Sequence, residues 1–135
     1  MPEVRKILGI DYGTANLGLA LADLETRMAF TYTTLRNDNQ LVEKISAIIV
    51  KENIEKIIIG TPMHENQAGT LAVEKFGGML TEKTGVSVEY QNEMFTTQSA
   101  QRNLIEKGEK RVSKQDDAEA ARIILQEWLD KTYSV

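Results

Sequence analysis

The chain has 135 residues, of which 41% are hydrophobic and 27% are charged, as in a typical single-domain globular protein. It contains no cysteine and one histidine, which excludes disulfides, cysteine zinc sites and any site built on a pair of histidines. The net charge of −4 counts against a simple electrostatic nucleic-acid binder. No apolar run approaches the roughly 20 residues that span a bilayer, and the first six residues lack the form of a signal peptide. We therefore expect one domain over residues 1–135, in the cytoplasm and without membrane contact.

The first half of the chain predicts three strands and a helix. Aliphatic, aromatic and β-branched residues form strand-like segments at residues 4–10, 17–22 and 28–35. The first two segments are close enough to pair as a hairpin across the turn at residues 12–16. Apolar residues then recur at helical spacing, and we expect Asp38 to cap a helix over residues 39–53.

The second half predicts alternating strands and helices. The continuous apolar run at residues 56–60 indicates a strand that is covered on both faces. After a polar loop, the pattern predicts in turn a helix ending at Gly85, a strand, a helix, a basic loop and a last helix, at residues 70–84, 86–90, 96–107, 108–112 and 114–131. Four large side chains are expected in the core: Phe76, Met79, Leu80 and Trp128. This order predicts an α/β fold, a mixed sheet with helices on its faces.

Three acidic residues stand where chemistry is possible. Asp11 ends the first strand, Glu93 follows the last strand, and Asp117 begins the apolar stripe of the final helix. Each has an ordinary alternative: Asp11 can accept turn hydrogen bonds, Glu93 can be a surface residue, and Asp117 can favour the helix dipole.

Together the three acids fit a site for divalent cations. Carboxylates that converge repel one another unless hard cations such as Mg²⁺ lie among them, and these cations prefer oxygen ligands. Such ions can activate water and stabilise a phosphodiester as it is cleaved. The acids Asp11, Glu93 and Asp117 are therefore expected to bind the metal and to be catalytic.

Several other residues are candidates for nucleic-acid contact. A local basic stripe can track a phosphate backbone even in an acidic protein, although it can equally be a solvated helix end. The residues of this stripe are Arg102, Lys107, Lys110, Arg111 and Lys114. Thr14 could also meet phosphate, and His64 could contact phosphate or simply be exposed.

Four segments, in their order and spacing, resemble the YqgF/RuvX family, known as Holliday junction resolvase-like proteins and pre-16S rRNA nucleases. The segments are Gly9-Ile10-Asp11-Tyr12-Gly13-Thr14, Gly60-Thr61-Pro62, Asn92-Glu93-Met94-Phe95-Thr96-Thr97 and Asp117-Ala118-Glu119-Ala120-Ala121. The resemblance covers nearly the whole chain. It implies a ribonuclease H-like fold with five strands, a three-strand antiparallel meander followed by parallel strands. It also implies that Asp11, Glu93 and Asp117 occupy the family's acidic positions, and that Mg²⁺ or Mn²⁺ supports trimming of the 5′ end of precursor 16S rRNA.

The chain also departs from the family pattern as we know it. Asn16 and Met94 stand where the family usually has arginine, which would hold phosphate in a forked contact. Asn16 is accordingly a candidate nucleic-acid contact. The loop after Pro62 is about two residues longer than we expect for the family, judged against typical loop lengths. All three acids are present, so we expect metal binding to be kept. We expect the departures to affect substrate binding and specificity and, to a lesser degree, activity.

Other functions remain open at this point. The substrate could be structured rRNA precursor or branched DNA, and the small ribosomal subunit is a further expected partner. The fold could also serve a non-catalytic nucleic-acid or ribosome-binding module, because fold does not determine function. The segment from Asp11 to Asn16 also resembles the first phosphate loop of actin-like ATPases, which need two such domains. Cleavage within or from the end of a strand, and a monomer or a weak homodimer, are equally open.

Overall fold

The computed structural model describes residues 5–61, 67–92 and 114–133, which form a five-stranded sheet and three helices. The strands are β1 (Lys6–Asp11), β2 (Asn16–Asp23), β3 (Ala29–Arg36), β4 (Ile54–Thr61) and β5 (Ser87–Asn92). The helices are α1 (Leu41–Glu52), α2 (Gln67–Thr84) and α4 (Lys114–Thr132).

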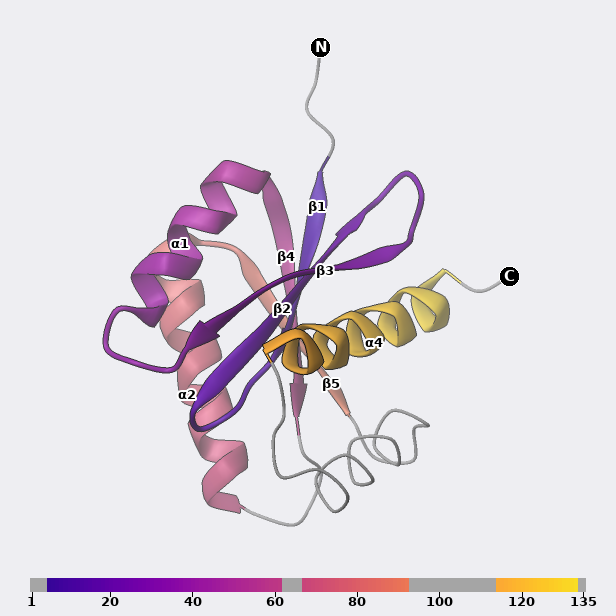
Figure 1. Cartoon of the computed structure of the whole chain (residues 1–135). Helices are drawn as coiled ribbons and strands as arrows, with labels where there is room; N and C mark the ends of the chain where they lie inside the picture. The colour runs from indigo at the N-terminus through magenta and orange to yellow at the C-terminus, as the bar shows by residue number, and fades with distance from the viewer. Residues whose placement is uncertain (1–4, 62–66, 93–113, 134–135) are drawn as a thin grey trace, which may run out of the picture.

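The sheet has the strand order β3-β2-β1-β4-β5. β1, β2 and β3 pair antiparallel in sequence order, and β4 and β5 continue the sheet parallel to β1. The expected meander followed by parallel strands is therefore confirmed. β1, β4 and β5 all run the same way (Figure 1), so their last residues lie at one edge of the sheet.

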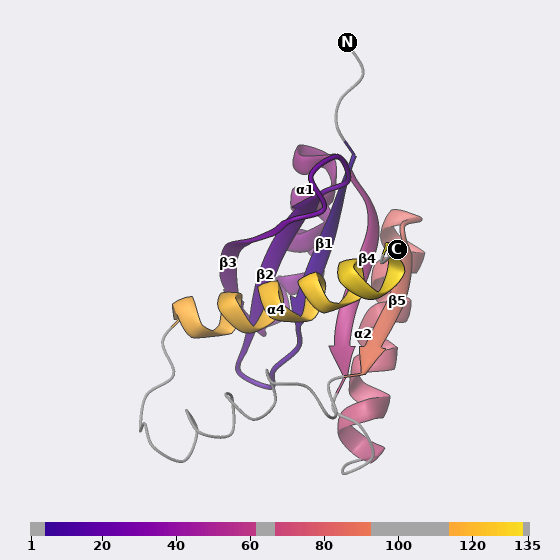
Figure 2. The same ribbon diagram turned by 90° about the vertical axis from the view of Figure 1, so that its right-hand side faces the viewer.

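The helices cover the two faces of the sheet as separate layers. α1 and α2 lie together on one face, and α4 crosses the other face (Figures 1 and 2). Each face has its own core of buried apolar side chains, one under α1 and α2 and one under α4. Among the described residues, no helix has the length and hydropathy needed to cross a membrane.

Alternation along the strands assigns side chains to the two layers. Leu8 and Ile10 of β1 belong to the core under α1 and α2, whereas Ile7 belongs to the core under α4. β4 does the same, with Ile57 and Ile59 on one face and Ile58 on the other, so it is covered on both faces as expected.

The start of α1 differs from the sequence expectation. Asp38 does not cap the helix: the residue before its first turn is Gln40, which makes no side-chain capping hydrogen bond. Instead, the Asp38 carboxylate accepts a hydrogen bond from the backbone N–H of Gln40 at 2.9 Å. A side chain that bonds the backbone two residues on forms a turn of its own, so the helix begins two residues later than predicted.

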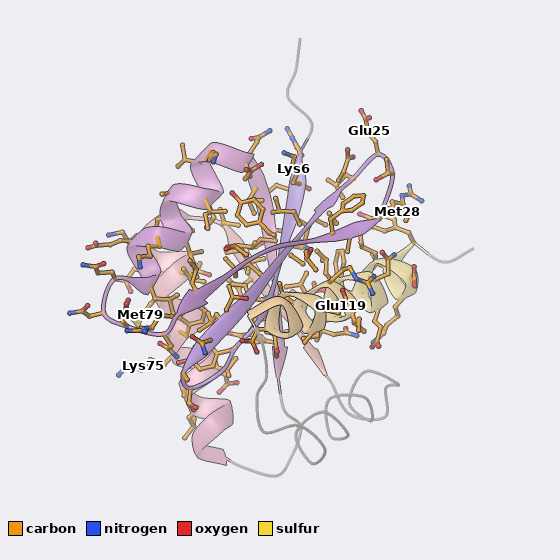
Figure 3. The ribbon with its side chains drawn as sticks, in the orientation of Figure 1. Lys6, Glu25, Met28, Lys75, Met79 and Glu119 are labelled. Carbon is orange, nitrogen blue, oxygen red and sulfur yellow. The ribbon has the colours of Figure 1, made fainter. Side chains whose placement is uncertain are left out.

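α2 contains a second difference. Phe76 and Leu80 are buried against the sheet as predicted, but Met79 is 47% exposed. Figure 3 shows Met79 and Lys75 on the outer side of α2, away from the sheet. An apolar residue on a helix flank is common in soluble proteins, and sequence spacing alone did not separate this flank from the buried face.

Other predicted elements match closely or cannot be compared. α2 begins three residues earlier than expected and ends at Thr84, as expected. The next residue, Gly85, has the positive φ of 76° that favours glycine. The final helix spans nearly the predicted residues, and Trp128 on it is buried. The predicted helix at residues 96–107 and the basic loop at 108–112 lie outside the described residues.

A polar cluster links β1, β3 and α1 at the end of the sheet where β1 begins. Glu52 accepts hydrogen bonds from the Lys6 ammonium at 2.9 Å and from the Tyr32 hydroxyl at 3.0 Å. The Lys6 contact, and to a lesser degree the Tyr32 contact, lower the pKa of Glu52 despite its desolvation. Burial, followed by the contact with Glu52, raises the pKa of Tyr32. The cluster fastens the end of α1 to two strands.

We expect Glu52→Gln to lower the free energy of unfolding by roughly 1–2 kcal/mol at pH 7, because a charge-assisted contact is lost. The folded pKa of Glu52 is lowered, so its contribution is complete above the ordinary value of 4.5 and disappears as the pH falls through the folded value. Urea unfolding of both proteins between pH 7 and pH 3 should therefore show the difference shrinking with acid. The matched control is Glu55→Gln, whose exposed pair with Arg5 should contribute less than about 1 kcal/mol. Equal effects of the two variants would contradict the cluster's role.

Candidate active site

Asp11 is the last residue of β1 and points towards the layer of α4. Ile10 before it belongs to the opposite core, and strand alternation therefore turns Asp11 to the other face. Its neighbours across the sheet are Gly18 on β2 and Gly60 on β4. Because both neighbours are glycines, the space beside the Asp11 carboxylate contains no side chain from either adjacent strand.

Asp117 lies near Asp11, on the helix that covers this face of the sheet. It lies in the first turn of α4, and its backbone packs directly on Gly18. A Cβ atom on Gly18 would lie 1.8 Å from the carbonyl oxygen of Asp117, which no structure tolerates. Gly18 is thus the contact that lets the start of α4 reach the sheet surface.

Gly18 brings Asp11 and Asp117 to adjacent positions. It pairs with Asp11 across the β1–β2 ladder, where opposed Cα atoms are about 4.5–5.5 Å apart. Both aspartates are partly buried, and both have interaction partners. The backbones of two of the three predicted acids therefore lie close together at the edge where β1 ends.

The predicted position of the third acid, Glu93, cannot be compared with the structure. β5 ends at Asn92, and Glu93 lies outside the described residues. Within the part of the chain that the structure describes, no group of three or more acidic or histidine side chains could hold a metal ion. The shared site of Asp11, Glu93 and Asp117 thus stays a prediction.

Glu119 is another acid near the start of α4, and its carboxylate is engaged elsewhere. Both of its carboxylate oxygens accept hydrogen bonds from Arg122, each at 2.7 Å. This contact lowers the pKa of Glu119 and raises that of Arg122. Figure 3 shows Glu119 on α4. Among the acids of α4 whose side chains the structure describes, Asp117 is the one whose backbone contacts Gly18, and we assign it to the candidate site.

The loop between β1 and β2 is fixed in shape by two contacts. The side-chain amide of Asn37 donates to the carbonyl of Gly13 at 2.8 Å, and the backbone N–H of Asn37 donates to the carbonyl of Ala15 at 2.9 Å. The Tyr12 ring packs against Phe76 of α2, with centroids 5.0 Å apart. The loop therefore presents its exposed residue Thr14 next to Asp11 on a rigid base.

Of the predicted nucleic-acid contacts, the structure describes a few. Thr14 and Asn16 lie in or beside this loop, Asn16 as the first residue of β2, and Lys114 is the first residue of α4. The others are outside the described residues: His64, Arg102, Lys107, Lys110 and Arg111. The sequence reasoning gave no structural role to Gly18 or Asn37, although Gly18 had a signal: a glycine inside a strand often marks a close approach by another backbone.

Further along, α4 is anchored to the sheet by polar contacts. The side-chain carbonyl of Gln126 accepts from the backbone N–H of Ala29, and its amide donates to the carbonyl of Arg27. The Trp128 indole N–H donates to the Glu89 carboxylate on β5. These contacts hold α4 at both edges of the sheet and so fix the position of Asp117 at its start.

The donors that meet here suit a hard divalent cation. Asp11 and Asp117 contribute carboxylate oxygens, which Mg²⁺ and Mn²⁺ prefer. On the Gly18 side the backbone of Asp117 fills the space that a side chain would take, and on the other side Gly60 adds no side chain beside Asp11. On these grounds the residues present fit such an ion.

We expect Gly18→Ala to lower the free energy of unfolding by roughly 1–3 kcal/mol, because the new methyl group meets the Asp117 backbone. Gly78→Ala is the matched control, because a Cβ there meets nothing within 4 Å. In the interior of α2 this control should stabilise the protein by about 0.5–1 kcal/mol. Thermal unfolding of the two variants checks the opposite signs, and a neutral Gly18→Ala would contradict the close contact.

Comparison with known proteins agrees with this geometry. The family model "RuvX: Holliday junction resolvase" matches residues 5–131. A Streptococcus gordonii protein named "Putative pre-16S rRNA nuclease" is 33% identical, over 95% of this chain and 99% of its own. A protein of the same name from Pseudomonas syringae pv. syringae is 34% identical, over 97% and 95% of the two chains.

Two solved structures share the fold at low sequence identity. Thermus thermophilus RuvC in complex with a Holliday junction substrate superposes with a TM-score of 0.61 at 15% identity, covering 96% of each chain. The Fowlpox virus resolvase superposes with a TM-score of 0.60 at 13% identity, covering 96% of this chain and 99% of the viral one. The ribonuclease H-like fold of these resolvases is the fold of this chain, and the matched family model together with relatives above 30% identity over nearly its full length shows that it belongs to the RuvX family.

Proposed function

We propose that this protein is a metal-dependent nuclease that hydrolyses phosphodiester bonds while processing the 5′ end of precursor 16S rRNA. The observation that carries the proposal is the contact of Gly18 with the start of α4, which sets Asp117 beside Asp11 at the edge where β1 ends. The names of the relatives supply the substrate class.

The protein's own contribution is to hold acidic groups rigidly. Asp11 stands on a central strand and Asp117 on an anchored helix, and Glu93 follows directly on β5 in sequence. Asp11, Glu93 and Asp117 would bind Mg²⁺ or Mn²⁺. When bound, the ion lowers the pKa of water and stabilises charge on the phosphate. Groups fixed on strands and helices are positioned more precisely than groups on loops.

The strand to be cleaved would run over the edge of the sheet. The exposed Thr14 and the neighbouring Asn16 offer a hydroxyl and an amide near Asp11, and both can donate to phosphate oxygens. The basic stripe of Arg102, Lys107, Lys110, Arg111 and Lys114, together with His64, would extend the contact along the backbone. Such a substrate implies a cytoplasmic protein that meets the precursor of the small ribosomal subunit.

Asn16 and Met94 bear on the strength of this grip. An amide at Asn16 makes weaker phosphate contacts than a guanidinium, and Met94 makes none. We therefore expect a substrate affinity that depends more on the basic stripe, with a correspondingly steep decrease as salt is raised.

Substituting either aspartate by asparagine tests the proposal. Because partners that only orient a metal ligand cost 10–100-fold when removed, we expect Asp11→Asn and Asp117→Asn each to lower cleavage by at least about 100-fold. The measurement is cleavage of precursor 16S rRNA and of a four-way DNA junction, with Mg²⁺ and with Mn²⁺. Asp130→Asn is the matched control on the exposed last turns of α4 and should cleave like the wild type.

The outcomes separate the alternatives. Cleavage that persists in Asp11→Asn would indicate a contaminating nuclease, and cleavage that persists with a chelator would contradict metal dependence. Preference for the junction would favour a resolvase-like DNA nuclease. Tight RNA binding without cleavage at any metal concentration would identify a non-catalytic module.

A further inference from the structure

One row of residues crosses the sheet at the candidate site. In register, from β2 to β5, it contains Gly18, Asp11, Gly60 and Gln91. Asp11 and Gln91 are two strands apart, which puts their Cα atoms about 10 Å from each other. Between them stands Gly60, which has no side chain to fill the interval.

Gln91 points to the same face as Asp11. Glu89, two residues earlier on β5, contacts Trp128 of α4, and Tyr90 between them contacts α2 on the opposite face through its hydroxyl and the carbonyl of Glu74. Alternation therefore turns Gln91 back to the face of α4. Asp11 and Gln91 thus flank Gly60 on one surface.

The environment of Gln91 is unusual for an amide. It is 5% exposed and is the one buried polar residue in the part of the chain that the structure describes. No described residue makes a hydrogen bond with its side chain. Buried polar groups are nearly always hydrogen-bonded, and a buried exception calls for an explanation such as a ligand or a catalytic role.

We infer that the Gln91 side-chain amide donates a hydrogen bond to a non-bridging oxygen of the scissile phosphate, across Gly60 from Asp11. This inference rests on the nuclease function proposed above. It assigns Gln91 to substrate binding at the reacting group, in addition to the three acids.

The chemistry favours a donor over a metal ligand. Mg²⁺ keeps several waters and takes only one or two carboxylates together with substrate phosphate, so the acids already meet its needs. A phosphate oxygen requires donors, and an amide N–H₂ provides two without adding charge to the site. Gln91 is the described donor in this row that is already desolvated.

Two variants separate these roles. Gln91→Met has nearly the same shape but no donor, and Gln91→Glu keeps an oxygen but cannot donate when ionised. A hydrogen bond to a charged group corresponds to a factor of about 10–100. We therefore expect both variants to lower kcat/KM for precursor 16S rRNA by about 10–100-fold. Calorimetry with Mn²⁺ alone should give the wild-type affinity for Gln91→Met and an equal or tighter one for Gln91→Glu.

Tyr90→Phe is the matched control, next along the same strand and facing α2, and should leave cleavage unchanged. Wild-type kcat/KM in Gln91→Met, or full activity in Gln91→Glu, would overturn the assignment while leaving the nuclease function intact. Weaker Mn²⁺ binding by Gln91→Met would overturn it in favour of a metal ligand. A wild-type protein that does not cleave would overturn both proposals, and thermal unfolding confirms that each variant is folded.

Discussion

The structure depends on a helix that lies closer to a sheet than side chains normally allow. α4 meets the sheet at two glycines: Gly9, where a Cβ would lie 2.7 Å from the Cβ of Leu125, and Gly18 under Asp117. At both positions the absence of a side chain lets α4 contact the strand directly, with no layer of side chains between them. The close fit of the two surfaces therefore fixes the position of the helix. Its buried face, which includes Ala121 and Leu125, completes the core between α4 and the sheet.

The close contact between α4 and the sheet explains how Asp11 and Asp117 can both lie on the otherwise apolar face that α4 covers. A carboxylate near a core is costly unless hydrogen-bonded, paired or bound to a cation. At the end of β1, the close contact between Gly18 and the start of α4 brings the backbones of Asp11 and Asp117 together beside the buried apolar residues. The parallel strands β1, β4 and β5 end at this same edge, which is where ligands usually bind in open α/β sheets.

Much of this was predictable from periodicity and some of it was not. The five strands, the three described helices and the sheet type follow from apolar patterns, because strands and helices repeat with different periods. The positions of Asp11 and Asp117 at element ends followed from the same patterns. Their proximity did not, since it depends on Gly18, whose role appears only when β2 and α4 are packed. The predictions that Met79 is buried and that Asp38 caps a helix were wrong for local reasons. The flank of a helix resembles its buried face in sequence, and an aspartate that forms a turn resembles one that caps a helix. Gln91 gave no signal at all, because burial at the end of a strand is a property of the folded sheet.

The anchoring of the loop from Tyr12 to Asn16 has a consequence for how such a protein can change over time. Asn37 donates hydrogen bonds to two carbonyls of the loop, and Phe76 packs against the Tyr12 ring. The shape of the loop is therefore imposed by the residue that follows β3 and by α2. The exposed side chains of Thr14 and Ala15 take no part in those supports, to which Ala15 contributes only its backbone carbonyl. Selection can therefore change the exposed side chains at the tip of the loop at little cost to the stability of the fold.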